Sequence, residues 1–173
     1  MHGYLILIPI FVFIVVLLIS TKRTERQVGF PYVPAKTLFS AAERKFMTEL
    51  DMVVGPQYRV FGKVRIADVA TVKQGLSRSS HQAALNRIAA KHFDFVICRR
   101  NDLSVVCAVE LNDSSHNTKR VQRRDVFVAQ VCQAVRLPLW NVTVAAAYSP
   151  EALSSQFQSI IVGTNSAGRD SGT

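Results

Sequence analysis

The chain has 173 residues, 49% of them hydrophobic, which is enough for one globular domain with a packed core and short extensions. Its formal net charge of +9 favours a polyanionic partner, either nucleic acid or anionic lipid, with a basic but unpartnered surface as the alternative. Cys98, Cys107 and Cys132 form no CxxC pair and lie in apolar stretches. Composition therefore argues against a zinc site or a disulfide framework and predicts buried, reduced thiols.

The N-terminal segment is almost wholly apolar. Residues 3–19 carry no charge, and as a helix they would span roughly 25 Å, which suffices for a bilayer if Tyr4 and Lys22 reach the interfaces. A cleaved signal peptide is the alternative, but the start lacks Lys and Arg, and the run ends in Ser-Thr-Lys-Arg. The flanking basic residues all follow the run. The positive-inside rule therefore predicts a single-pass inner-membrane protein with a cytoplasmic C-terminal domain.

The segment after this anchor predicts a linker and then a folded domain. The linker is polar and carries Gly and Pro, which break regular structure. Ser40 and Glu43 match a capping box, and the apolar spacing after them predicts a helix that ends at Gly55. We therefore predict a transmembrane anchor at 1–21, a linker at 22–37, a folded domain at 38–148, and a short helix with a disordered tail, from about residue 163, at 149–173.

Hydrophobic periodicity predicts the remaining elements of the domain. In chain order they are a strand at 58–61, a turn or bulge at Gly62, a second extended piece at 64–69, a short helix at 83–90, strands at 92–98 and 104–111, a helix at 119–136, a strand at 137–142 and a final helix from Ser149. The two central strands predict an antiparallel hairpin, and the strand–helix–strand after it predicts a right-handed crossover. The fold class is therefore α/β, with a mixed sheet flanked by helices.

Two acidic residues interrupt the apolar strands of this hairpin. Asp94 lies between two Phe residues, and Glu110 lies near the end of the neighbouring strand, where an unpaired charge is costly. Strand periodicity puts Glu110 and Asn112 on one face, and across a hairpin Asp94 can approach Glu110. Two carboxylates that meet there raise each other's pKa or bind a hard divalent ion such as Mg²⁺. The alternative is that both are ordinary strand-end residues that face solvent.

Further candidate groups follow this strand. The segment ELNDSSH at 110–116 gathers oxygen and imidazole ligands, and His116 is a candidate general base or partner of a metal-bound water. The alternative for His116 is a loop histidine bonded to the backbone. Asp125 shares the apolar stripe of the next helix, so we expect its carboxylate to point back toward the sheet, unless it pairs with Arg124 or a lysine.

Basic residues gather at the start of the same helix and before the strand at 92–98. Cations at a helix N-terminus oppose the helix dipole, so contact with phosphate explains such a cluster better than helix stability does. A solvated helix face is the alternative. The candidate nucleic-acid-binding residues are Lys91, Lys119, Arg120, Arg123 and Arg124.

Several stretches between residues 38 and 144 resemble the DUF2726 family, a domain of uncharacterised function found in bacterial proteins. They are FSAAERKFMTEL, KVRIADV, LNRIAAKHFDFVIC, VVCAVELNDSSH and QRRDVFVAQVCQAVRLPLWNV. That family resembles a branch of the PD-(D/E)xK, or restriction-endonuclease-like, superfamily and is similar to the very-short-patch-repair-type nucleases. The resemblance implies a restriction-endonuclease-like mixed sheet and a phosphodiesterase site in which acidic residues and a nearby His surround Mg²⁺.

The resemblance also assigns roles to the candidate residues. It implies that the metal is held by Asp94, Glu110 and Asn112, that His116 assists proton transfer, and that Asp125 and Arg124 complete or orient the site. The superfamily motif has Lys two residues after the acid, and relatives in the family usually have an acid there, whereas this chain has Asn112, which removes a negative charge. The expected function is a membrane-anchored, Mg²⁺-dependent endonuclease. The alternatives are a non-catalytic nucleic-acid-binding module on a nuclease fold and a membrane-surface assembly protein.

Overall fold

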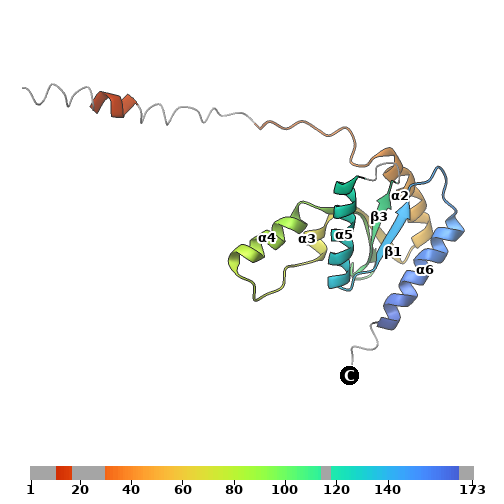
Figure 1. Cartoon of the computed structure of the whole chain (residues 1–173). Coiled ribbons are helices and arrows are strands. Elements are labelled where there is room, and N and C mark those ends of the chain that lie inside the picture. Colours follow the sequence, from red (N-terminus) through yellow and green to blue (C-terminus); the bar gives the residue numbers. More distant parts are fainter. Residues whose placement is uncertain (1–10, 17–29, 114–117, 168–173) are drawn as a thin grey trace, which may run out of the picture. The chain divides into compact units, whose positions relative to one another are not determined.

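The computed structural model describes residues 11–16, 30–113 and 118–167. The chain divides into two units, Met1–Leu38 and Phe39–Thr173. The boundary between them lies next to the predicted start of the folded domain at residue 38. Figure 1 shows the elements of both units.

The N-terminal unit corrects the prediction of a membrane anchor. The predicted span at 3–19 lies largely outside the described residues, within which residues 11–16 are helical. A bilayer core about 30 Å thick requires about 20 helical residues. In the part of the chain that the structure describes, no helix combines the length and the apolar character needed to cross a membrane. This finding overturns the predicted N-terminal transmembrane helix and the predicted single-pass inner-membrane location.

The second unit is built on a mixed sheet, which confirms the predicted α/β class. The described strands are β1 (Tyr58–Arg65), β2 (His92–Arg99), β3 (Val105–Asn112) and β4 (Leu139–Thr143), and they lie in that order. The β1–β2 and β2–β3 pairs are antiparallel, and the β3–β4 pair is parallel. The predicted hairpin is therefore β2–β3, and α5 (Lys119–Ala134) is the helix of the predicted crossover.

Helices cover both faces of this sheet (Figure 1). On one face lie α2 (Ala41–Val54) and α6 (Pro150–Ala167), and on the other lie α3 (Ile66–Val69), α4 (Arg78–Ala89) and α5. The predicted capping box begins α2, because the Ser40 hydroxyl accepts from the Glu43 N–H and the Glu43 carboxylate accepts from the Ser40 N–H. The sheet is thus enclosed between two helical layers.

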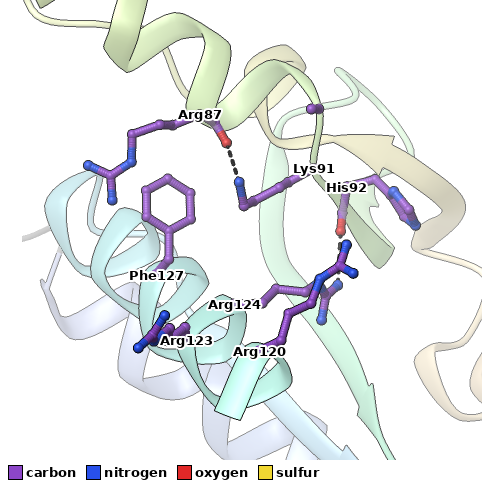
Figure 2. Close-up of a pocket in the computed structure, with 8 residues that line it drawn as sticks. Arg87, Lys91, His92, Arg120, Arg123, Arg124 and Phe127 are labelled. Atoms are coloured by element: carbon purple, nitrogen blue, oxygen red, sulfur yellow. Dashed lines mark hydrogen bonds between the residues drawn. The ribbon is translucent and has the colours of Figure 1, made fainter. Parts of the chain in front are cut away.

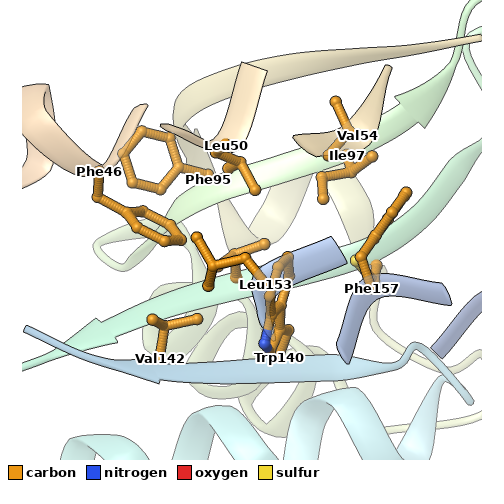
Figure 3. Packing of buried hydrophobic residues seen from close by; sticks show 11 residues of the cluster. Phe46, Leu50, Val54, Phe95, Ile97, Trp140, Val142, Leu153 and Phe157 are labelled. Atoms are coloured by element: carbon orange, nitrogen blue, oxygen red, sulfur yellow. The ribbon is translucent and has the colours of Figure 1, made fainter. Parts of the chain in front are cut away.

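The core under α2 and α6 combines aromatic and aliphatic side chains (Figure 3). Phe46, Phe95 and Phe157 are fully buried, and Trp140 is 4% exposed. The rings of Trp140 and Phe157 stack with their centroids 6.1 Å apart. Because Phe157 lies on α6, the last helix is part of the core, and it continues past residue 163, where we predicted a disordered tail, to residue 167.

The three thiols are buried and free, as predicted. Burial is the first cause that raises the pKa of Cys107 to about 12 and that of Cys132 to about 11. A thiol with so high a pKa stays protonated at neutral pH and is a poor nucleophile. These cysteines therefore pack as small apolar side chains.

The extended piece predicted at 64–69 is correct for Val64 and Arg65 and wrong for Ile66–Val69. Strand β1 continues without a turn to Arg65, and Ile66–Val69 forms one helical turn. The β-branched residues of this segment favour a strand locally, but the fully buried Ile66 packs this turn into the core between the sheet and α4, and tertiary packing outweighs propensity. Gly62 serves a close contact here instead of a turn, because a Cβ there would lie 2.2 Å from Cζ of Phe39.

Helix α4 begins earlier than the predicted 83–90. It starts at Arg78, because Ser77 caps it by accepting a hydrogen bond from the Ser80 N–H. A serine in this position satisfies one of the unpaired N–H groups of a first helical turn. The extra turn carries no apolar stripe, so periodicity alone did not reveal it.

Candidate functional site

Glu110 is a charged side chain in the protein interior. It lies on β3 with 3% of its surface exposed, and its Oε2 atom is 2.9 Å from Nη2 of Arg124 on α5. The contact is an ion pair without regular hydrogen-bond geometry, so among the described residues neither carboxylate oxygen has a well-formed hydrogen bond. A buried carboxylate normally satisfies its oxygens with hydrogen bonds or a cation. Glu110 thus retains capacity for a further ligand.

Asp94 lies beside Glu110 on the neighbouring strand. The register pairs Phe95 with Val109, which puts Asp94 opposite Glu110 one residue further along. Oδ2 of Asp94 accepts a hydrogen bond of 3.0 Å from the N–H of Leu111, so a side chain links the two strands at this point. The hairpin therefore brings the two predicted carboxylates together.

The electrostatic environment of Glu110 favours its protonated form. Burial and the charge of Asp94 raise the pKa of Glu110 to about 7, and Asp125 adds to this, although Arg124 opposes it. Asp125 lies on α5, half-buried, with Oδ1 3.4 Å from Nη1 of Arg124. Asp125 thus forms the salt bridge with Arg124 that was the alternative prediction, and that its carboxylate points back toward the sheet stays a prediction. At neutral pH these groups form one coupled cluster.

Lys63 joins this cluster and was not predicted. Its Nζ pairs with Oε1 of Glu43 and lies 3.7 Å from Oδ1 of Asp94. Its φ is +56°, in the left-handed region that residues other than Gly seldom adopt, at a point where the regular β1–β2 register skips a pair. Glu43 both caps α2 through Oε2 and binds Lys63 through Oε1. Burial raises the pKa of Glu43, but hydrogen bonds from Lys63 and Ser40 lower it below its usual value.

The other two predicted residues follow Glu110 in the chain. Asn112, at the end of β3, donates a hydrogen bond from Nδ2 to Oδ1 of Asn141 on β4 at 3.3 Å. Its amide is thus engaged by the adjacent strand. His116 lies outside the described residues, so its predicted role remains a prediction.

A basic pocket of about 530 Å³ lies between α4, β2 and α5 (Figure 2). Its charged or titratable lining residues are Arg87, Lys91, His92, Arg120, Arg123 and Arg124. Phe127 forms an apolar wall, with the Arg87 guanidinium 4.6 Å and the Lys91 ammonium 4.9 Å from its ring centroid. Lys91 also donates to the carbonyl of Arg87 at 2.8 Å. No acidic side chain is among the lining residues, so the pocket suits an anion.

Most of the predicted basic residues meet in this pocket. Lys91, Arg120, Arg123 and Arg124 line it, and Lys119 does not. Arg87, which belongs to the basic residues before the strand at 92–98, and Phe127 line it as well, although neither is among the candidate nucleic-acid-binding residues. The three-residue spacing of Arg124 and Phe127 puts this pair on one side of α5, and Lys91 follows the end of α4, but only the packing of α4 near α5 combines these residues into one pocket.

The residues of the acidic cluster suit a hard cation in part. Within 11–16, 30–113 and 118–167, no group of three or more His, Cys, Asp or Glu side chains is arranged to hold a metal ion. Mg²⁺, however, usually keeps several waters and needs only one or two carboxylates together with substrate phosphate. Asp94 and Glu110 supply two such groups, and the unbonded oxygens of Glu110 fit that use.

Comparison with known proteins assigns a family but no activity. The model of the family described as "Protein of unknown function (DUF2726)" matches residues 35–160, which include all of the described sheet and the start of α6. Neither curated proteins nor solved structures give a significant match. Because the family match spans most of the sequence, this chain belongs to the DUF2726 family.

Proposed function

We propose that this protein is a metal-dependent nuclease that hydrolyses phosphodiesters of nucleic acid. The observation that carries the proposal is the buried Glu110, whose oxygens lack hydrogen bonds within the described residues and which lies opposite Asp94. A pair of carboxylates held on adjacent strands is costly unless a cation or protons offset the charge. The relationship to the PD-(D/E)xK superfamily that the motifs suggest is part of this proposal.

Each residue of the cluster has a defined part in this proposal. Asp94 and Glu110 hold the divalent ion, which when bound supplies positive charge for the scissile phosphate and a more acidic water. Asp94 is oriented by the Leu111 N–H and by the nearby Lys63 ammonium. Arg124 lies between this cluster and the basic pocket, and its permanent charge offsets negative charge on the substrate.

The basic pocket supports nucleic acid as the substrate class. Its cations come from two helices and the start of β2, and two of them are held against the ring of Phe127. Arg and Lys side chains on a concave surface whose lining holds no acidic residue match the backbone phosphates of DNA or RNA. The overall charge of +9 adds long-range attraction for the same polyanion.

A second candidate is a nucleic-acid-binding module without catalysis. The PD-(D/E)xK motif has a charged residue at the position of Asn112, and relatives in the family usually do as well. The Asn112 amide here donates a hydrogen bond to Oδ1 of Asn141. Arg124 already lies against Glu110, which partly offsets the charge that a cation would otherwise neutralise. This candidate retains the basic pocket and dispenses with the metal.

Cleavage and binding assays on the full chain distinguish the two. Supercoiled plasmid and single-stranded RNA are incubated with the protein in Mg²⁺, in Mn²⁺ or in EDTA. The nuclease proposal expects metal-dependent cleavage that Asp94→Asn and Glu110→Gln abolish while oligonucleotide binding persists. Asp51→Asn, which neutralises an exposed acid on α2, is the matched control and retains cleavage. Tight oligonucleotide binding by the parent protein with no cleavage in either metal would select the binding module instead.

A further inference from the structure

Arg124 belongs to both candidate sites at once. Its Nη2 atom lies 2.9 Å from Oε2 of Glu110 and donates a hydrogen bond of 3.3 Å to the carbonyl of His92. Its Nη1 atom lies 3.4 Å from Oδ1 of Asp125. The same side chain lines the basic pocket and is 35% exposed. It is therefore accessible to a ligand in the pocket while it still contacts the buried carboxylate.

The contact between Arg124 and Glu110 is a close ion pair that lacks regular hydrogen-bond alignment. The guanidinium is within ion-pair distance of the carboxylate but outside hydrogen-bond geometry. Arginine forms its strongest contacts as paired, parallel hydrogen bonds to carboxylate or phosphate. A phosphate group in the pocket offers such an arrangement, and it is surrounded there by Arg120 and Arg123 as well. Phosphate is thus a competitive partner for Arg124.

Arg124 and a divalent cation also compete for the same carboxylate. Both carry positive charge, and both would occupy the space beside the Glu110 oxygens. While the guanidinium stays there, it repels an incoming cation and offsets the negative charge that attracts it. When the guanidinium turns to an anion in the pocket, the oxygens of Glu110 become available.

We propose that Arg124 couples the two sites, so that a phosphodiester bound in the basic pocket draws the guanidinium from Glu110 and increases cation affinity at Asp94 and Glu110. This coupling rests on the proposed function, because it requires a cation at the two carboxylates. It makes metal binding conditional on substrate, and by linkage the cation strengthens phosphodiester binding by the same factor. The pocket volume of about 530 Å³ falls in the range of small-ligand sites and admits a nucleotide unit around the phosphate.

The test measures Mn²⁺ binding to the full chain, from the magnetic-resonance signal of the free ion, with and without the dinucleoside monophosphate TpT. TpT carries one phosphodiester and serves as the probe for the pocket. The variants are Arg124→Gln and, as the matched control, Arg123→Gln. Arg123 lines the same pocket, and among the residues that the structure describes the ion pair of Glu110 is with Arg124. Both variants remove one positive charge from α5, so general electrostatic effects are equal to a first approximation.

For the parent protein, TpT should increase Mn²⁺ affinity at least about fivefold, the lower end of typical coupling between sites. Arg124→Gln should bind Mn²⁺ more tightly than the parent when TpT is absent, and its response to TpT should be smaller. Arg123→Gln should weaken TpT binding and, without TpT, raise Mn²⁺ affinity less than Arg124→Gln does, because it is Arg124 that contacts Glu110.

Two different results would overturn the coupling. Equal Mn²⁺ affinity of the parent with and without TpT, together with no gain in Arg124→Gln, would refute the role of Arg124 and leave the metal site intact. Absence of Mn²⁺ binding to the parent and to both variants would remove the proposed metal function as well. The parent measurement alone decides between these results if a variant fails to fold.

Discussion

Neutralising Glu110 should change how the stability of the metal-free protein depends on pH. In the folded chain the pKa of Glu110 is raised from its ordinary value of 4.5 to about 7, mainly by burial. Between these values the folded state holds a proton that the unfolded state has released. Stability from this group is therefore present below pH 4.5 and declines as pH rises toward 7.

The magnitude follows from the size of that shift. A difference between 4.5 and about 7 corresponds to about 3 kcal/mol of lost stability once Glu110 is fully ionised in both states. In Glu110→Gln this loss is absent, because the amide has the shape of the protonated acid and does not ionise. The variant should thus resemble the parent near pH 4.5 and exceed it in stability by up to about 3 kcal/mol near pH 8.

Urea denaturation of both proteins in EDTA, at pH values from 4.5 to 8, measures this difference. Every other titrating group is common to the two proteins, so the change in their difference with pH reports Glu110 together with its charge interactions with Asp94, Arg124 and Asp125. Added Mg²⁺ should restore part of the parent's stability at high pH and leave the variant unchanged. Stability curves that stay parallel across this range would refute the account of Glu110 as a buried, electrostatically strained carboxylate.

Three further substitutions test the packing around the site. Gly62→Ala should lower the free energy of unfolding, measured by urea denaturation, by about 1–3 kcal/mol, because the new Cβ would lie 2.2 Å from the Phe39 ring. An unchanged free energy of unfolding would contradict that contact. Phe157→Ala should cost about 3–5 kcal/mol by calorimetry, since the ring is fully buried, and a small loss would mean that α6 is dispensable. Lys63→Gly should be more stable than Lys63→Ala by roughly 1 kcal/mol, because φ at this position is positive and Gly adopts positive φ without strain. Within regular strands and helices Ala is normally the more stable of the two, and that order here would exclude the left-handed backbone.

The elements with local chemical signals were predictable. The capping box places the start of α2, because its two hydrogen bonds join residues only three apart. The pairing of β2 with β3 follows from two apolar runs around a short turn, and the opposition of Asp94 and Glu110 follows from that pairing. The basic residues at the start of α5 were visible as a cluster that the helix dipole does not explain.

Other features depend on contacts that no local pattern encodes. Apolar composition alone suggested a membrane helix at 3–19, and no described helix has the length and apolarity for that task. The segment Ile66–Val69 reads as a strand by propensity but forms a helical turn once Ile66 is buried. Lys63 carried no signal, because a positive φ and a place beside Asp94 arise only when β1 pairs with β2.

Local signals specify most of the strands and helices that hold the charged side chains, because capping, periodicity and turn chemistry act between residues near in the chain. Packing between distant segments, in contrast, makes α4 and α5 enclose one basic pocket and puts Arg124 between that pocket and Glu110. Burial of Glu110 likewise results from the closing of helices over the sheet. Its raised pKa and its unbonded oxygens are consequences of packing between distant segments, and desolvation has no local signature in a sequence.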